Sequence, residues 1–268
     1  MAYGDDATRR PLSHWLQWGL GLTVLGAIAL GVTAYRDRPD FAATADVQQA
    51  IEDDERIARL VAEVARRFPA DYRRLWSERL IVLDKSNFKA SLQNETAGFF
   101  NALLRAHKAD ILGAPDAALA AIAAARATHI IHLEVDSPEA CASYARFAIS
   151  PFWEKSSEQK QHAAAVDVAL LRAADAGSRG RTDRSRSRGV EAANAAFSAS
   201  ETALGMTPKQ IEMQSRTSII GLRESPKAQC RAGVLYYQAI ARLPAPLAAA
   251  LVAQDLRTSP ILGGPDQH

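Results

Sequence analysis

Residues 15–34, WLQWGLGLTVLGAIALGVTA, decide the architecture of this chain of 268 residues. The stretch contains no charged side chain, and pairs of arginines flank it on both sides. A helix of this length rises about 30 Å, which matches the hydrocarbon core of a bilayer. Trp15, Trp18 and Tyr35 lie at its two ends, where aromatic rings meet the membrane–water interface. The sequence therefore predicts a transmembrane helix over residues 15–35.

A cleaved secretory signal peptide is the alternative to an uncleaved anchor. The basic pair Arg9 and Arg10 and the small residues around Ala34 suit a signal peptide. The apolar region of such a peptide usually spans about 7–15 residues, however, and this one is longer. We therefore expect a signal anchor that is preceded by a short tail of residues 1–14.

The orientation of the anchor is predicted from the size of the flanking segments. The arginines are nearly balanced across the span, so the positive-inside rule gives no strong preference. A short N-terminal tail before a large C-terminal domain favours a cytoplasmic tail, and the two cysteines discussed below favour the same arrangement. We expect a single-pass protein of the inner (plasma) membrane with its C-terminal domain outside the cytoplasm.

Four small residues recur at every fourth position of the span. Small residues at this spacing lie on one helix face and allow a second helix to approach closely. They predict a packing face for self-association or for a partner protein, although Gly is also common in membrane helices generally. These residues are Gly19, Thr23, Ala27 and Gly31.

The composition of the rest of the chain predicts an all-α, Ala-rich globular domain. About one residue in five is Ala and only 7% are aromatic, which favours closely packed helices over sheets. Apolar residues recur at helical spacing in segments that Gly and Pro separate. We expect a multi-helix domain in two parts, residues 40–176 and 190–262, joined by a flexible loop of residues 177–189 and followed by a disordered tail of residues 263–268.

Several helix boundaries can be placed from local signals. Apolar residues from Val47 to Phe68 fall on one helical face, and Pro69 should end that helix. The acidic run of residues 52–55 is expected to be solvated. An Ala-rich helix is predicted from Asp116 to about His129.

The predicted loop, GSRGRTDRSRSRG, places arginines among Ser and Gly without any apolar residue. A segment with nothing to bury is expected to be mobile. A solvated loop without a partner is the simplest interpretation, and contact with anionic lipid headgroups or another polyanion is the functional one. Nucleic acid is not expected as a partner, because no aromatic residues interleave and the net charge is only +2. The arginines concerned are Arg179, Arg181, Arg184, Arg186 and Arg188.

Cys141 and Cys230 are the two cysteines of the chain. Each follows a Ser-Pro pair, which is typical of a capped helix start with Pro in the first turn. An even cysteine count in a domain outside the cytoplasm predicts a structural disulfide between them. Two buried free thiols are the alternative if the domain faces the cytoplasm. A redox-active pair is disfavoured, because the sequence has no Cys-x-x-Cys motif.

The histidines give the only hint of a metal site. His129 and His132 are one helical turn apart and close to Glu134, a spacing that zinc ligands can have. Their apolar neighbours instead indicate a helix end that packs into the core, so no metal ligand is predicted. His107 and His162 are distant in the sequence, which does not show whether they join the pair.

Catalytic motifs are missing from the sequence. It has no Gly-x-Ser-x-Gly elbow and no Gly-rich phosphate-binding loop, so no catalytic residue and no cofactor are predicted. The heavy use of Ala and Arg suggests a bacterial origin. The sequence therefore favours a membrane-anchored helical protein that acts as an interaction or scaffold component of the bacterial cell envelope. A membrane-anchored envelope hydrolase and a secreted helical protein with a cleaved signal peptide are the alternatives.

Overall fold

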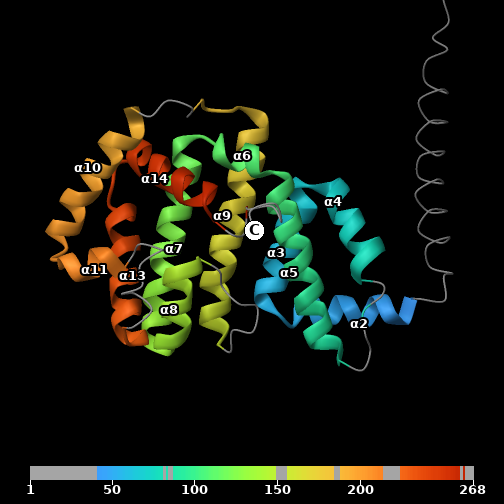
Figure 1. Cartoon of the computed structure of the whole chain (residues 1–268). Helices are drawn as coiled ribbons and strands as arrows, with labels where there is room; N and C mark the ends of the chain where they lie inside the picture. Colours follow the sequence, from blue (N-terminus) through green and yellow to red (C-terminus); the bar gives the residue numbers. More distant parts are fainter. Residues whose placement is uncertain are drawn as a thin grey trace, which may run out of the picture. The chain divides into compact units, whose positions relative to one another are not determined.

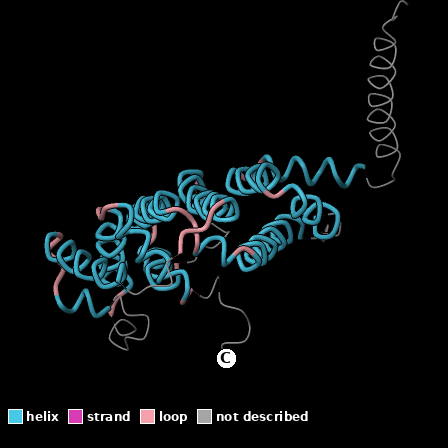
Figure 2. The backbone as a smooth tube through the Cα atoms, turned by 90° about the horizontal axis from the view of Figure 1, so that it is seen from above, coloured by secondary structure: helices cyan, strands magenta, loops and turns pink. Residues whose placement is uncertain are grey.

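A computed structural model describes residues 41–80, 83, 87–148, 156–183, 188–213, 224–259 and 262. These residues form helices joined by short connections, and no strand occurs among them (Figure 2). The predicted all-α class is therefore confirmed. The predicted transmembrane helix, including the packing face at Gly19, Thr23, Ala27 and Gly31, lies outside the described residues. The tails of residues 1–14 and 263–268 lie outside them as well.

The chain divides into two compact units, residues 1–46 and 47–268. Within the first unit the described residues are 41–46, which form the first half of helix α2 (Phe41–Glu52). The second unit contains the rest of α2 and all the other described helices. The candidate functional site lies entirely in the second unit.

Helix α9 (Ser157–Arg179) lies in the middle of the second unit, between α3 (Glu55–Arg67) and α7 (Asp116–Asp136) (Figure 1). On the α3 side, α3 continues into α4, and α5 and α6 pack nearby. On the α7 side, α8, α13 and α14 pack against α7, and α10 packs against α14. The bounds of these and the remaining helices are α4 Pro69–Arg74, the π-helix η1 Leu75–Leu80, α5 Phe88–Ala106, α6 Lys108–Leu112, α8 Pro138–Phe147, α10 Arg188–Ala203, α11 Pro208–Met213, α13 Pro226–Ala241 and α14 Ala245–Arg257.

Helix α7 is the described helix that is long and apolar enough to cross a bilayer. It contacts α8, α9, α13 and α14, and it buries Leu119, Ile122 and Ile130 against them. Its fully buried Arg126 forms an ion pair with Asp255 of α14, with 2.6 Å between Nη1 and Oδ2. These contacts identify α7 as a core helix of the second unit, packed on α8, α9, α13 and α14. The helix continues to Asp136, seven residues beyond the predicted end near His129.

Cys141 of α8 and Cys230 of α13 form a disulfide, as predicted. Both cysteines are buried in an apolar cluster that α7, α8 and α13 share. Each Ser-Pro helix start also forms as predicted. Ser137 Oγ accepts a hydrogen bond from the backbone N–H of Ala140 at the start of α8, and Ser225 caps α13 in the same way.

The single helix predicted from Val47 to Phe68 is wrong, because the chain breaks between α2 and α3. Asp54 is the N-cap of α3, and its Oδ1 accepts a hydrogen bond from the backbone N–H of Ile57. Its Oδ2 accepts a second hydrogen bond from Lys160 Nζ of α9 at 2.7 Å. Part of the acidic run is therefore buried rather than solvated. Asp is one of the residues favoured at the N-cap of a helix, so Asp54 starts a new helix here and interrupts the predicted one.

Helix α9 includes the first three residues, 177–179, of the predicted Arg-rich loop. Gly177 is buried where α9 crosses α6, and a Cβ atom placed there would lie 1.9 Å from the backbone oxygen of Asp110. Gly is therefore required for this close approach. The loop was predicted from the polar composition of the segment. The helix extends further because its end packs against α6.

Candidate functional site

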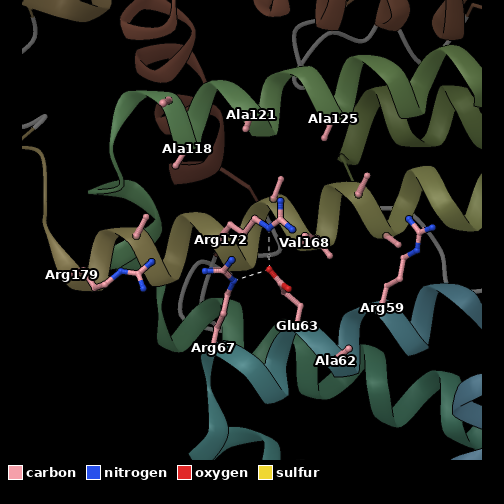
Figure 3. A pocket seen from close by; sticks show the side chains of 15 residues that line it. Arg59, Ala62, Glu63, Arg67, Ala118, Ala121, Ala125, Val168, Arg172 and Arg179 are labelled. Atoms are coloured by element: carbon pink, nitrogen blue, oxygen red, sulfur yellow. Dashed lines mark hydrogen bonds and ion pairs between the residues drawn. The ribbon is translucent and has the colours of Figure 1, made fainter.

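A groove of about 890 Å³ lies on the surface of the second unit, with walls formed by α3 and α7 and a floor formed by α9 (Figure 3). Its walls and floor consist mainly of alanine side chains, with Val168 as the one larger apolar residue. Arginines line the α3 and α9 sides. The lining residues are Arg59, Ala62, Glu63 and Arg67 of α3, Ala117, Ala118, Ala121 and Ala125 of α7, and Ala164, Ala165, Val168, Ala169, Arg172, Ala176 and Arg179 of α9.

The groove is long and follows the axis of α9. Its lining residues on that helix run from Ala164 to Arg179, which corresponds to about 22 Å at 1.5 Å per residue. Arg179 and Arg59 lie toward opposite ends of the groove in Figure 3. Ala117 and Ala121 of the α7 wall are exposed, so the groove presents apolar surface to solvent along α7.

Glu63 lies at the centre of the groove and binds three arginines. Its Oε1 accepts hydrogen bonds from Arg67 Nε at 2.6 Å and from Arg172 Nε at 3.0 Å, and its Oε2 accepts one from Arg66 Nη2 at 2.6 Å. Arg172 belongs to α9 and the other two to α3, so these contacts join the two helices. Figure 3 shows Arg67 and Arg172 converging on the Glu63 carboxylate.

The pKa of Glu63 is strongly lowered. Burial alone would raise it, but the hydrogen bonds from Arg67, Arg172 and Arg66 outweigh burial and lower the pKa from 4.5 to about 2. The carboxylate therefore remains ionised at all physiological pH values. It cannot act as a general acid or a proton acceptor near neutrality.

We expect acid to weaken folding through Glu63. Because its folded pKa lies below the unfolded value, the stabilisation is complete above about pH 4.5 and is lost as the pH falls toward 2. At neutral pH the Glu63→Gln variant should lose about 2–3 kcal/mol of unfolding free energy, and its stability should depend less steeply on pH between 4.5 and 2. Urea unfolding at a series of pH values measures both effects.

The exposed Glu191 provides a matched control. The Glu191→Gln variant removes the same charge without removing a buried carboxylate, and it should keep the acid dependence of the parent protein. If the unfolding free energy of Glu63→Gln depended on pH between 4.5 and 2 as steeply as that of the parent protein, Glu63 would not stabilise the fold through its arginines.

A second carboxylate, Asp175, lies beside the groove and pairs with two of its lining arginines. Asp175 of α9 forms ion pairs with Arg67 of α3 and with Arg179, the latter with 2.8 Å between Nη2 and Oδ2. The side chain of Arg179 nevertheless remains 68% exposed, and that of Arg172 remains 58% exposed. Both guanidinium groups can therefore contact a ligand without losing their internal partners.

Arginines outnumber carboxylates among the described residues in and beside the groove. The excess is on the α3 and α9 sides, because the α7 wall carries no charged lining residue. The groove is therefore apolar along one wall and electropositive along the other. The arginines are Arg59, Arg66, Arg67, Arg172 and Arg179, and the carboxylates that pair with them are Glu55, Glu63 and Asp175.

The five arginines that were predicted to contact an anionic surface do not all lie in one loop, because two of them belong to helices. Arg179 ends α9 and lines the groove. Arg181 follows it and forms an ion pair with Asp110 of α6 at 2.6 Å, with its side chain 62% exposed. Arg184 and Arg186 lie outside the described residues. Arg188 begins α10, and its side chain is not described.

The predicted histidine pair is split by the fold. His129 is fully buried against the ring of Tyr144, and burial lowers its pKa to about 3, so it is neutral at physiological pH. His132 faces α9 instead, where it stacks on His162 and contacts Glu158. His107 is elsewhere, with its Nδ1 3.0 Å from a carboxylate oxygen of Asp110.

The sequence could not identify the groove, because its walls come from segments about 50 residues apart or more. Arg172 and Arg179 lie two helical turns apart on α9, but the sequence predicts a loop at Arg179, so their alignment along one helix is not evident from the sequence. Comparison with family models, with curated proteins and with solved structures finds no match to this chain.

Proposed function

We propose that this chain is an interaction protein whose groove binds an acidic amphipathic helix of a partner protein. One observation carries the proposal: a long alanine-lined groove has an excess of arginine on two of its three sides. The proposal agrees with the interaction or scaffold role that the sequence favours.

The shape of the groove suits a helix. A length of about 22 Å accommodates about four helical turns. Helix axes pack 8–10 Å apart, and the closest approach requires small side chains at the contact. The alanines of α7 and α9 supply such a surface, so a helix placed over α9 could contact both walls. The partner would replace solvent along the exposed alanines of α7.

The charges specify the chemistry of the partner. Arg172 and Arg179 are seven residues apart, so their guanidinium groups are spaced by about 10 Å along α9. Carboxylates seven residues apart on a docked helix have the same spacing. The opposite face of that helix should be small and apolar, because the α7 wall is alanine. We therefore assign the site to a helix with Glu or Asp on one flank and Ala or Leu on the other.

An enzymatic role for the groove has less support. Among the described residues that line the groove, the only carboxylate is Glu63, which is held ionised by three arginines. A general acid and base pair needs a group that exchanges protons near the working pH. The geometry of the groove therefore favours binding over hydrolysis.

We further propose that the predicted span of residues 15–35 anchors this binding domain in the inner membrane, with the domain outside the cytoplasm. The buried Cys141–Cys230 disulfide supports this location, because disulfides persist in oxidising compartments. Self-association through Gly19, Thr23, Ala27 and Gly31 would present several grooves side by side on one membrane.

Binding of synthetic helical peptides to the full-length protein in mild detergent tests the groove. The probe is a fluorescein-labelled peptide of about 18 residues with an Ala/Leu face flanked by glutamates, and a second peptide carries lysines in their place. We expect saturable binding of the acidic peptide and none of the basic one. The Arg172→Glu/Arg179→Glu variant should weaken binding by about tenfold or more, with fluorescence anisotropy as the readout.

The matched control reverses the charge of two arginines outside the groove. Arg73 and Arg105 are exposed on α4 and α5, and Arg73→Glu/Arg105→Glu changes the net charge by the same amount. This control should keep the affinity of the parent protein. Equal losses in both double variants would show that only net charge matters, which would contradict a groove-specific site.

A second pair of variants tests the shape of the site. Ala121→Tyr fills the groove from the α7 wall, whereas Ala195→Tyr places the same side chain on the exposed face of α10. Only the first should prevent binding. Binding of anionic phosphatidylglycerol vesicles that is lost in Arg172→Glu/Arg179→Glu, without any peptide binding, would overturn the proposal in favour of a lipid surface.

A further inference from the structure

Three metal-ligating side chains meet where the end of α7 crosses the beginning of α9. His132 lies in the last turns of α7, and Glu158 and His162 lie in the first two turns of α9. Their ligand atoms all lie within 4.8 Å of one another. This cluster is separate from the groove, whose α7 wall ends at Ala125.

The distances between the donor atoms suit one small cation. Glu158 Oε1 lies 3.0 Å from His132 Nδ1 and 3.9 Å from His162 Nε2. Tetrahedral zinc with bonds of about 2.1 Å separates neighbouring ligand atoms by about 3.4 Å. The two observed distances bracket that value. The imidazole rings are stacked with centroids 3.7 Å apart. The χ2 torsion of histidine has a broad distribution, so rotation about it can reorient each ring toward a shared ion.

The backbone that carries two of the ligands is held in place. Glu158 and His162 are four residues apart, so they share one face of α9. The turns of α9 around them are tied to Glu55 of α3, whose carboxylate accepts hydrogen bonds from Ser157 Oγ at 2.9 Å and Gln161 Nε2 at 3.0 Å. Sites on rigid helices position ligands more accurately than sites on loops.

We propose that His132, Glu158 and His162 bind a divalent transition-metal ion, with Zn²⁺ as the reference ion. Two imidazole nitrogens and one carboxylate oxygen are donors that zinc and its first-row neighbours favour over Mg²⁺ or Ca²⁺. Three protein ligands leave a coordination position open to solvent, because Glu158 is 64% exposed at its side chain. The ion would link the end of α7 to the beginning of α9. This inference does not depend on the proposed partner helix.

Zinc titration of the tag-free, full-length protein in mild detergent tests the site, with isothermal calorimetry as the readout. After chelator treatment we expect one equivalent of Zn²⁺ to bind, and excess Mg²⁺ should not compete. The His132→Ala/His162→Ala variant should lose more than about 100-fold in affinity. Co²⁺ in place of Zn²⁺ should give a visible d–d absorption band that the double variant lacks.

The control is the other histidine–carboxylate contact described above. His107→Ala removes a histidine whose Nδ1 lies 3.0 Å from an Asp110 carboxylate oxygen, and it should leave Zn²⁺ affinity unchanged. Circular dichroism of each variant checks that its helices are retained. Failure of the parent protein to bind Zn²⁺, or equal binding by the His132→Ala/His162→Ala variant, would overturn the proposal.

Discussion

Loss of the Cys141–Cys230 disulfide is expected to lower the free energy of unfolding by about 4–5 kcal/mol. The two cysteines are 89 residues apart, and in the chain-entropy model a cross-link over a loop of this length restricts the unfolded chain by about that amount. The bond also lies inside the cluster that joins α8 and α13 to α7. Urea unfolding of the full-length protein with and without reductant measures the effect.

The Cys141→Ala/Cys230→Ala variant separates the disulfide from other effects of the reductant. It should unfold at the lower urea concentration under both conditions, and reductant should not change it further. Both cysteines are buried, so alkylation of the non-reduced parent protein should fail until the protein is denatured and reduced. A difference below about 1 kcal/mol would contradict the assigned role of the bond.

Replacement of Gly177 by Ala is expected to destabilise the protein by about 3 kcal/mol or more. The added Cβ would lie 1.9 Å from the backbone oxygen of Asp110 and 2.7 Å from its carbonyl carbon. Backbone cannot rotate away as a side chain can, so α6 and α9 must separate. For a unit of this size, such a loss lowers Tm by about 6–12 °C. Thermal unfolding followed by circular dichroism measures it.

Gly98 is the matched control within the same chain. It lies in the middle of α5, and a Cβ placed there meets no atom within 4 Å. Gly98→Ala should therefore stabilise the protein by about 0.5–1 kcal/mol, because Ala favours the helix. Similar effects of the two substitutions would show that the α6–α9 contact is looser than described.

Features that depend on neighbouring residues were predictable from the sequence. The Ser-Pro starts of α8 and α13 act through hydrogen bonds three residues along the chain, so their signals are local. The disulfide followed from the cysteine count once the compartment was assumed. The all-α class followed from the Ala content and the spacing of apolar residues.

Features that depend on contacts between distant segments were not predictable. The extension of α9 through Gly177 depends on the backbone of α6, which lies more than 60 residues earlier. The groove needs α3, α7 and α9 side by side, and its alanines look the same in sequence as alanines buried in the core. The ion pairs of Glu63 with Arg172 and of Asp175 with Arg67 span more than 100 residues.

For the pair His129 and His132, helix geometry explains why the sequence did not predict both environments. Residues three apart on a helix differ in direction by about 60°, which is enough for His129 to face the core and His132 to face the surface of α7. The pattern of apolar neighbours correctly indicated burial for His129. It gave no information on His132, whose partners Glu158 and His162 are on another helix.

The alanine lining of the groove has a thermodynamic consequence for any partner. Alanine has no side-chain rotamers to lose, so the alanines of the α7 wall and of the floor would lose no side-chain entropy if a partner helix docked as proposed. Only the arginine side chains need to become ordered when a partner docks. Association should therefore show a negative heat-capacity change from burial of methyl groups, with the entropic penalty confined to the arginine side of the groove.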